Sequence, residues 1–297
     1  MVSLGIGCGL GAAVFQSLSY LCIRLFNKRH NDNIIALLAL SHILMGLISI
    51  PLAVWLWSDA IPSFRVYGWS LLGTAGFYLL GQFFLFAAII HSEPSRVAPM
   101  LGLKVFLLAL ISVVFLSQDF DATKWIAVAL TTMAVLLLSG SGKRLEGRFI
   151  LLGLLACVSY CISDLCIKML VDHFADSGIL RAAVFATALS YIVCGVFGGV
   201  VIALNRHHST RDTWLYAIPF AASWFIAMIF LFTCFGLVGV VYGNILQSMR
   251  GIISIGLGFA IAHLGFESLE SKASKRIIAQ RLIAAVMMSG AVILFLK

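Results

Sequence analysis

The sequence is 297 residues long, 62% hydrophobic and only 11% charged, with a formal net charge of +8. Soluble domains are about half apolar and about a quarter charged, so this composition excludes an ordinary water-soluble protein and predicts that lipid surrounds most of the chain. The 20 basic residues are scattered over many short connections and form no stripe. This argues against nucleic-acid binding and is typical of loops at a membrane surface.

Ten apolar segments follow one another, and each approaches the length of about 20 residues that a bilayer-spanning helix needs. The predicted helices are 2–26, 34–57, 66–90, 97–117, 125–141, 149–170, 180–204, 214–235, 240–263 and 278–296. The connections are short and polar, and the longest, 264–277, is expected to form a short interfacial helix. The sequence therefore predicts an all-α, multi-pass integral protein of the cell inner membrane.

The second half of the chain repeats the first. Residues 9–25 read GLGAAVFQSLSYLCIRL, and residues 153–169, displaced by 144, read GLLACVSYCISDLCIKM. At a displacement of 146, Lys104 corresponds to Arg250. These matches predict two five-helix repeats, 1–141 and 149–297. An odd number of helices per repeat inverts the second relative to the first, which is typical of secondary transporters with a substrate site near the membrane midplane.

This organisation resembles the drug/metabolite transporter superfamily, in particular its ten-helix EamA-like branch. The resemblance is clearest at 77–140, where an aromatic-rich helix leads into a tight hairpin at 91–95, and 223–296 repeats that layout. It implies a carrier whose central cavity is lined by the first, third and fourth helices and by their counterparts, the sixth, eighth and ninth. Similar proteins carry amino acids, nucleotide sugars or triose phosphates, so the resemblance does not fix the substrate. Small multidrug antiporters use a Glu in the first helix, where this chain has no acidic residue and has Gln16 and Tyr20 as polar positions.

The charged residues inside the predicted spans include Arg24, Lys104, Asp164, Lys168 and Arg250. A charge at the centre of a membrane helix costs roughly 2.5–3.5 kcal/mol, so each of them should be compensated. Arg24 lies near a helix end and is expected to extend to the lipid headgroups. Lys168 follows Asp164 by four residues on the same helical face, which predicts an ion pair between the two.

Lys104 and Arg250 have no acidic residue three or four positions away, and the repeat relates them to each other. One interpretation is that each contacts backbone carbonyls or water in a packed interior. The other, which we adopt, is that both face one central cavity and together bind an anionic group of the substrate. The similar triose-phosphate carriers have basic residues on the corresponding helices. The hypothesis requires that neither Glu93 nor Asp164 already neutralises these cations.

Other polar residues gather on the first, third, sixth, eighth and ninth helices, where they are expected to line the same cavity. The expected substrate-binding residues are Lys104, Arg250, Gln16, Tyr20, Tyr78, Gln82, Tyr160, Asp164, Lys168, Trp224, Tyr242, Asn244 and Gln247. His42, in the middle of the second helix, is interpreted as a buried structural histidine. The seven cysteines lie inside apolar runs without C-x-x-C spacing and are interpreted as small core residues.

The sequence thus favours a secondary transporter that moves a small organic anion or phosphorylated metabolite by alternating access. Energy would come from an ion gradient or an exchanged substrate, since no G-x-x-x-x-G-K-[ST] motif is present. Two alternatives stay open: a flippase for a lipid-linked phosphate or amphiphile, and an exporter of a neutral or zwitterionic metabolite. An enzyme is not expected, and no cofactor or metal is implied, because the spans hold one acidic residue and no metal-ligand spacing.

The distribution of basic residues predicts the orientation. Lys and Arg are concentrated in the odd-numbered connections, as at Lys143, Arg144 and Arg148, and are scarce in the even-numbered ones. Because cytoplasmic loops carry the excess of basic residues, both termini are expected outside the cytoplasm. Well-described ten-helix relatives have the opposite arrangement.

Overall fold

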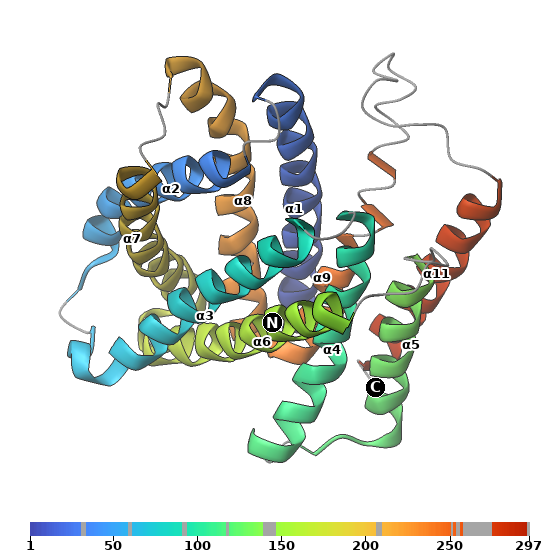
Figure 1. Cartoon of the computed structure of the whole chain (residues 1–297). Helices are drawn as coiled ribbons and strands as arrows, with labels where there is room; N and C mark the ends of the chain where they lie inside the picture. Colours follow the sequence, from blue (N-terminus) through green and yellow to red (C-terminus); the bar gives the residue numbers. More distant parts are fainter. Residues whose placement is uncertain are drawn as a thin grey trace.

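The chain forms a bundle of α-helices, shown in Figure 1 as a computed structural model. The structure describes residues 1–30, 34–58, 61–90, 94–116, 119–138, 147–205, 210–250, 252–253, 256–257 and 275–295. Within these ranges the regular elements are ten α-helices and one 3-10 turn, with no strand. The predicted all-α fold is confirmed.

The helix bounds agree with the ten predicted spans to within a few residues, except for the ninth. The helices are α1 (Val2–His30), α2 (Ile34–Leu56), α3 (Phe64–Ile90), α4 (Pro94–Leu116), α5 (Ala122–Leu138), α6 (Gly147–His173), α7 (Ile179–Asn205), α8 (Arg211–Val238), α9 (Val240–Ser248) and α11 (Lys275–Phe295). The 3-10 turn η1 (Ala175–Ser177) lies between α6 and α7. The predicted interfacial helix at 264–277 lies almost entirely outside the described residues.

The outside of the bundle is apolar and its interior holds polar side chains, the reverse of a water-soluble protein. Val54, Trp55 and Trp69 are 72%, 77% and 82% exposed, whereas Gln16 and Thr131 are fully buried. In the described part, α1, α2, α6, α7 and α8 are each long and apolar enough to cross a bilayer, and shorter apolar stretches lie in α4 and α11. The chain is therefore a multi-pass membrane protein. All seven cysteines are free thiols that are buried or partly buried, as expected of small core residues.

The junction between α8 and α9 is tight, and α9 is shorter than expected. Gly239 has φ 83°, a left-handed conformation suited to glycine, and its N–H donates to Phe235 O at 3.1 Å before α9 begins. The predicted span 240–263 is interrupted rather than continuous: α9 ends at Ser248, Met249 forms a turn, and helical residues resume at Arg250, 252–253 and 256–257, while 258–263 lie outside the described residues. The Ser248 hydroxyl donates to Ile245 O at 2.6 Å, and such a side-chain bond competes with the helical backbone.

The pattern of helix contacts is largely unchanged when the two halves of the chain are exchanged. The most extensive contacts include α1 with α8 and α3 with α6, which replace each other if α1 is equivalent to α6 and α3 to α8. Those of α2 with α7 and of α5 with α11 join each helix to its own counterpart, and the second pair is easily followed in Figure 1. Five helices per half turn the second half upside down. The fold agrees with inverted repeats, while the boundaries 1–141 and 149–297 stay a prediction.

The crossing of α2 and α7 is made by two glycines. A Cβ atom added to Gly46 would lie 3.0 Å from the Gly195 Cα, and one added to Gly195 would lie 3.0 Å from the Gly46 Cα. The same two Cβ atoms would lie 3.0 Å from the backbone oxygens of Tyr191 and His42, respectively. Backbone therefore packs directly on backbone, which small residues allow between membrane helices.

Candidate functional site

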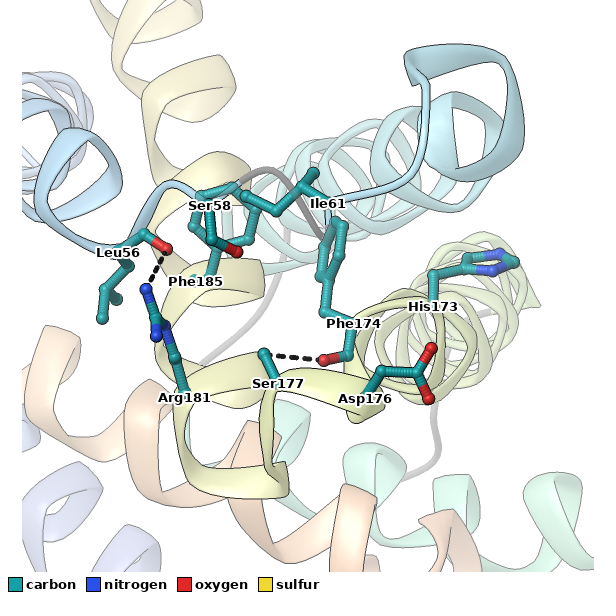
Figure 2. Close-up of a pocket in the computed structure, with 9 residues that line it drawn as sticks. All are labelled: Leu56, Ser58, Ile61, His173, Phe174, Asp176, Ser177, Arg181 and Phe185. Atoms are coloured by element: carbon teal, nitrogen blue, oxygen red, sulfur yellow. Dashed lines mark hydrogen bonds between the residues drawn. The ribbon is translucent and has the colours of Figure 1, made fainter.

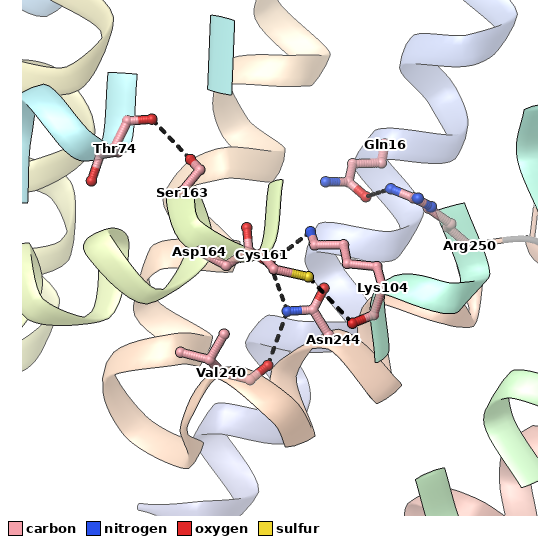
Figure 3. A network of polar contacts seen from close by, with 9 residues as sticks. All are labelled: Gln16, Thr74, Lys104, Cys161, Ser163, Asp164, Val240, Asn244 and Arg250. Atoms are coloured by element: carbon pink, nitrogen blue, oxygen red, sulfur yellow. Dashed lines mark hydrogen bonds and ion pairs between the residues drawn. The ribbon is translucent and has the colours of Figure 1, made fainter. Parts of the chain in front are cut away.

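A buried ion pair lies where α4, α6 and α9 meet. The Lys104 Nζ of α4 lies 2.6 Å from the Asp164 Oδ2 of α6, and the two side chains are 12% and 7% exposed. From α9, the Asn244 Nδ2 donates to the same oxygen at 2.7 Å and to Val240 O at 3.0 Å (Figure 3). Asp164 thus neutralises Lys104. The hypothesis that Lys104 and Arg250 together bind an anion is therefore wrong, because a carboxylate from another helix, distant in sequence, already binds Lys104.

Lys168, which the sequence pairs with Asp164, has a different partner. Its Nζ lies 2.5 Å and 2.6 Å from the two carboxylate oxygens of Asp172, four residues further along α6. The Lys168 and Asp172 side chains are 30% and 49% exposed. The predicted pair is therefore wrong: Asp172 offers the same helical spacing in a more exposed place, where an ion pair loses less hydration.

Arg250 follows the end of α9 and contacts α1. Its Nη1 donates to the Gln16 Oε1 at 3.1 Å, and its guanidinium carbon lies 5.9 Å from the centroid of the Tyr20 ring. Among the residues that the structure describes, no carboxylate forms an ion pair with Arg250. Glu93, the other acid considered from the sequence, lies outside them. Within the described part, Arg250 therefore has neutral partners and an uncompensated charge.

Gln16 has one buried amide donor without a partner. The residue is fully buried, and its Nε2 forms no hydrogen bond with any described residue. Because a guanidinium can only donate, the amide oxygen must face Arg250 and the amide nitrogen must face away from it, as Figure 3 shows. Buried polar atoms without partners are rare and call for an explanation such as a missing water or ion. An unused donor thus lies beside an uncompensated cation.

The backbones of the two cationic residues have equivalent environments in the two halves. The Ser17 hydroxyl of α1 shares its proton between Ala13 O at 2.8 Å and Arg250 O at 3.0 Å. The Cys161 thiol of α6 donates to Lys104 O at 3.5 Å. Ser17 and Cys161 are 144 residues apart and the two cations 146 apart, which are the displacements of the sequence repeat. The repeat thus extends to individual contacts.

The residues on α1 and α6 that face the cations also correspond, Gln16 with Tyr160 and Tyr20 with Asp164. Each cation lies over a ring of its own pair: the lysine Nζ is 5.7 Å from the Tyr160 centroid, and the arginine is over Tyr20. The decisive difference is at the second position of each pair. Asp164 gives the lysine a carboxylate, whereas Tyr20 gives the arginine only a ring.

Residues 3–140, which include the first five helices, match the model of the EamA-like transporter family. The first half of the chain is EamA-like. This match confirms, over the first half of the chain, the resemblance inferred from the sequence.

Solved structures support the same architecture beyond the EamA-like half. One crystal structure, described only as that of a protein, superposes with a TM-score of 0.72 and covers 98% of this chain and 96% of its own. The two sequences are 15% identical, so the likeness shows the fold alone. No curated protein matches the sequence.

Hydrogen bonds between aromatic side chains join further helices. The Trp224 Nε1 of α8 donates to the Tyr191 hydroxyl of α7 at 2.8 Å. The Tyr78 hydroxyl of α3 lies 3.2 Å from the Nε2 of His42 of α2, whose Nδ1 lies 2.7 Å from Leu38 O. Both ring nitrogens of this buried residue have partners, which confirms the structural interpretation of His42. The sequence analysis missed Tyr191, a single tyrosine in an apolar helix.

Tyr160 connects this aromatic group to the cations. Its ring centroid lies 6.4 Å from that of Tyr78 and 5.7 Å from the Lys104 Nζ. Tyr242, by contrast, stacks on Phe295 of α11, with the two ring centroids 5.2 Å apart. Gln82 interacts with Tyr78 and Gln247 is buried in α9. A role for any of these residues in substrate binding stays a prediction.

The pocket drawn in Figure 2 lies at one end of the bundle, between the end of α2 and the turn from α6 to α7. The Arg181 Nη2 donates to Leu56 O at 3.0 Å across it. Its lining residues are Leu56, Ser58, Ile61, His173, Phe174, Asp176, Ser177, Arg181 and Phe185. None was expected from the sequence. At the centre, Gln16, Asp164 and Asn244 are at most 5% exposed, and the expected central cavity stays a prediction.

Proposed function

We propose that the chain is a secondary transporter that moves a small organic anion across the membrane by alternating access, with Arg250 binding the negative charge. The single observation that carries this proposal is the combination of an uncompensated guanidinium and the unpaired Nε2 of Gln16. Arg250 takes the role alone, because Lys104 is already paired with Asp164.

The energetics support an anionic ligand at this position. A cation in the membrane interior costs roughly 2.5–3.5 kcal/mol on insertion scales, and Gln16 and Tyr20 compensate it only with a dipole and a ring. A bound anion accepts charge-assisted hydrogen bonds from the guanidinium and a further bond from the Gln16 amide. Binding therefore completes interactions that the protein leaves incomplete.

The repeat supports alternating access. In inverted-repeat transporters the substrate site lies between the halves, and exchanging their conformations opens it to the other side. Arg250 belongs to the second half and its partner Gln16 to the first, so relative movement of the halves acts directly on the proposed site. An ion gradient or an exchanged anion supplies the energy.

A zwitterionic substrate is the second candidate, because the Asp164 carboxylate belongs to the same polar group. It would bind a substrate ammonium in place of Lys104 while Arg250 binds the carboxylate. A lipid-linked substrate is disfavoured at the Gln16 amide, which is fully buried in this conformation.

The test is a ligand screen with a matched pair of variants. The purified protein is melted with organic acids, sugar phosphates, nucleotide sugars and amino acids, and any stabilising solute is assayed for uptake into proteoliposomes. Arg250→Gln should abolish both stabilisation and uptake, whereas Arg181→Gln, which removes a cation at the end of the bundle, should abolish neither. Uptake of an anion that survives in Arg250→Gln contradicts the proposal.

A further inference from the structure

The first half has Tyr20 where the second half has Asp164, and this difference suggests where the charged group of the substrate binds. We propose that the substrate presents a single carboxylate, which binds beside Arg250 and Tyr20 in the place that Asp164 occupies beside Lys104. This rests on the proposed function and adds to it the class of anion and its position. On this view the protein supplies one carboxylate itself and receives the second from the substrate.

The equivalence of the two places is established by contacts. The Ser17 hydroxyl of the first half donates to the backbone oxygen of Arg250 in the second half. The Cys161 thiol of the second half likewise donates to the backbone oxygen of Lys104 in the first half. Three positions further along each helix, at the displacement of 144, lie Tyr20 and Asp164. Since these contacts correspond in the repeat, we infer that the Asp164 carboxylate has an equivalent position beside Tyr20, near Arg250.

The donors around the two places are of the same kind. The Asp164 oxygen accepts from a cation at 2.6 Å and from a side-chain amide, that of Asn244, at 2.7 Å. The other place also has a cation and a side-chain amide, those of Arg250 and Gln16, although this amide comes from a different helix and its nitrogen faces away from the guanidinium. There the amide nitrogen is buried and lacks a partner among the described residues. The place beside Arg250 and Tyr20 thus has the same kinds of donor as the place beside Lys104, but it lacks a carboxylate acceptor.

The summed charge of Lys104, Asp164 and Arg250 favours a substrate group with a single negative charge. Asp164 cancels Lys104, so one positive charge, that of Arg250, remains within the described part. One carboxylate neutralises it, whereas a phosphate dianion leaves an uncompensated negative charge in the membrane interior, which is costly. A planar carboxylate also matches the two parallel donors of a guanidinium.

The test needs no knowledge of the substrate, because an aspartate at position 20 reproduces the proposed ligand. Tyr20→Asp places a carboxylate where Asp164 stands in the other half, and Tyr20→Asn is the matched neutral control. The melting temperature of Tyr20→Asp should exceed that of Tyr20→Asn by about 2–6 °C, and the difference should vanish when Arg250→Gln is added. A Tyr20→Asp protein that melts at or below Tyr20→Asn, or a gain that persists without Arg250, overturns the proposal.

A second variant covers the case in which position 20 does not tolerate a smaller residue. Gln16→Glu keeps the side-chain size and puts a carboxylate 3.1 Å from the guanidinium, so it should melt above the wild type. A lower melting temperature that is unchanged by Arg250→Gln overturns the assignment of an uncompensated cation.

The class of anion is tested with sodium acetate and sodium phosphate, against sodium chloride of equal ionic strength. Acetate should stabilise the wild type more than phosphate does, and should not stabilise Tyr20→Asp. A greater effect of phosphate overturns the carboxylate assignment. If Tyr20→Asp is stabilised through Arg250 but the wild type transports no anion, the proposed function fails and the assignment stands. If anion transport is unaffected by Tyr20→Asp, the assignment fails and the function stands.

Discussion

Asp164→Asn removes the negative charge of the central ion pair with almost no change in side-chain volume. Lys104, 12% exposed, then keeps a buried ammonium without a counter-charge among the described residues. Removing one partner of a buried ion pair typically costs about 3–5 kcal/mol of stability. At about 2–4 °C per kcal/mol, the value for domains of 150–250 residues, the melting temperature should fall by roughly 10 °C.

Asp172→Asn is the matched control. It also removes the aspartate of a Lys–Asp ion pair, and both aspartates lie on α6. Lys168 and Asp172 are 30% and 49% exposed, and pairs this exposed contribute about 1 kcal/mol or less. The melting temperature should therefore fall by about 4 °C at most. The double variant Lys104→Gln/Asp164→Asn should recover most of the loss of the single variant, because neutral replacement of a whole buried pair is often tolerated.

Thermal unfolding of the purified protein in detergent, followed by tryptophan fluorescence, measures these differences. Equal losses in Asp164→Asn and Asp172→Asn would show that burial of the central pair carries no energetic weight. A double variant that melts as low as Asp164→Asn would show that the loss arises from something other than an unpaired Lys104. Either result refutes the reasoning from charge compensation.

Three further predictions address the substrate, the packing and the orientation. Arg250→Lys keeps the charge but loses the planar pair of donors, so the affinity for any stabilising anion should fall by roughly 10-fold in a melting-temperature titration. Gly195→Ala should lower the stability by about 1–3 kcal/mol, because the added methyl meets the α2 backbone at 3.0 Å, whereas Gly199→Ala, which has open space, should be neutral in the same melting assay. A C-terminal reporter that fluoresces only in the cytoplasm should stay dark, and a bright signal would contradict the orientation derived from the basic residues.

Most of the fold could be predicted from the sequence because the bilayer imposes one requirement, apolar length, that single segments satisfy by themselves. The beginning of α2 at Ile34 and the end of α3 at Ile90 agree with that requirement. The end of α9 at Ser248 does not, because the apolar character of 240–263 continues past the place where the helix stops. Hydrophobicity alone therefore does not fix where this helix ends.

The ion pairs show where reasoning from helical spacing ends. Lys168 has acids four residues away on both sides, Asp164 and Asp172, and spacing alone cannot choose between them. The choice is made by Lys104, sixty positions from Asp164 in the sequence and 2.6 Å from it in space. The repeat held a usable signal, since the residues facing one cation correspond to those facing the other. This correspondence predicts the residues facing one cation only after those facing the other are known.

The crossing of Gly46 and Gly195 has a consequence for the transport cycle. Two helices that meet backbone to backbone have no side chains to rearrange at the contact, and each glycine presents the same surface to the other. When the two halves exchange conformations, this contact can stay in place as a pivot, because Gly46 and Gly195 contribute to it in the same way. Spin labels placed on either side of it should therefore report little change in separation between the two access states, while labels at the membrane surfaces report a large one.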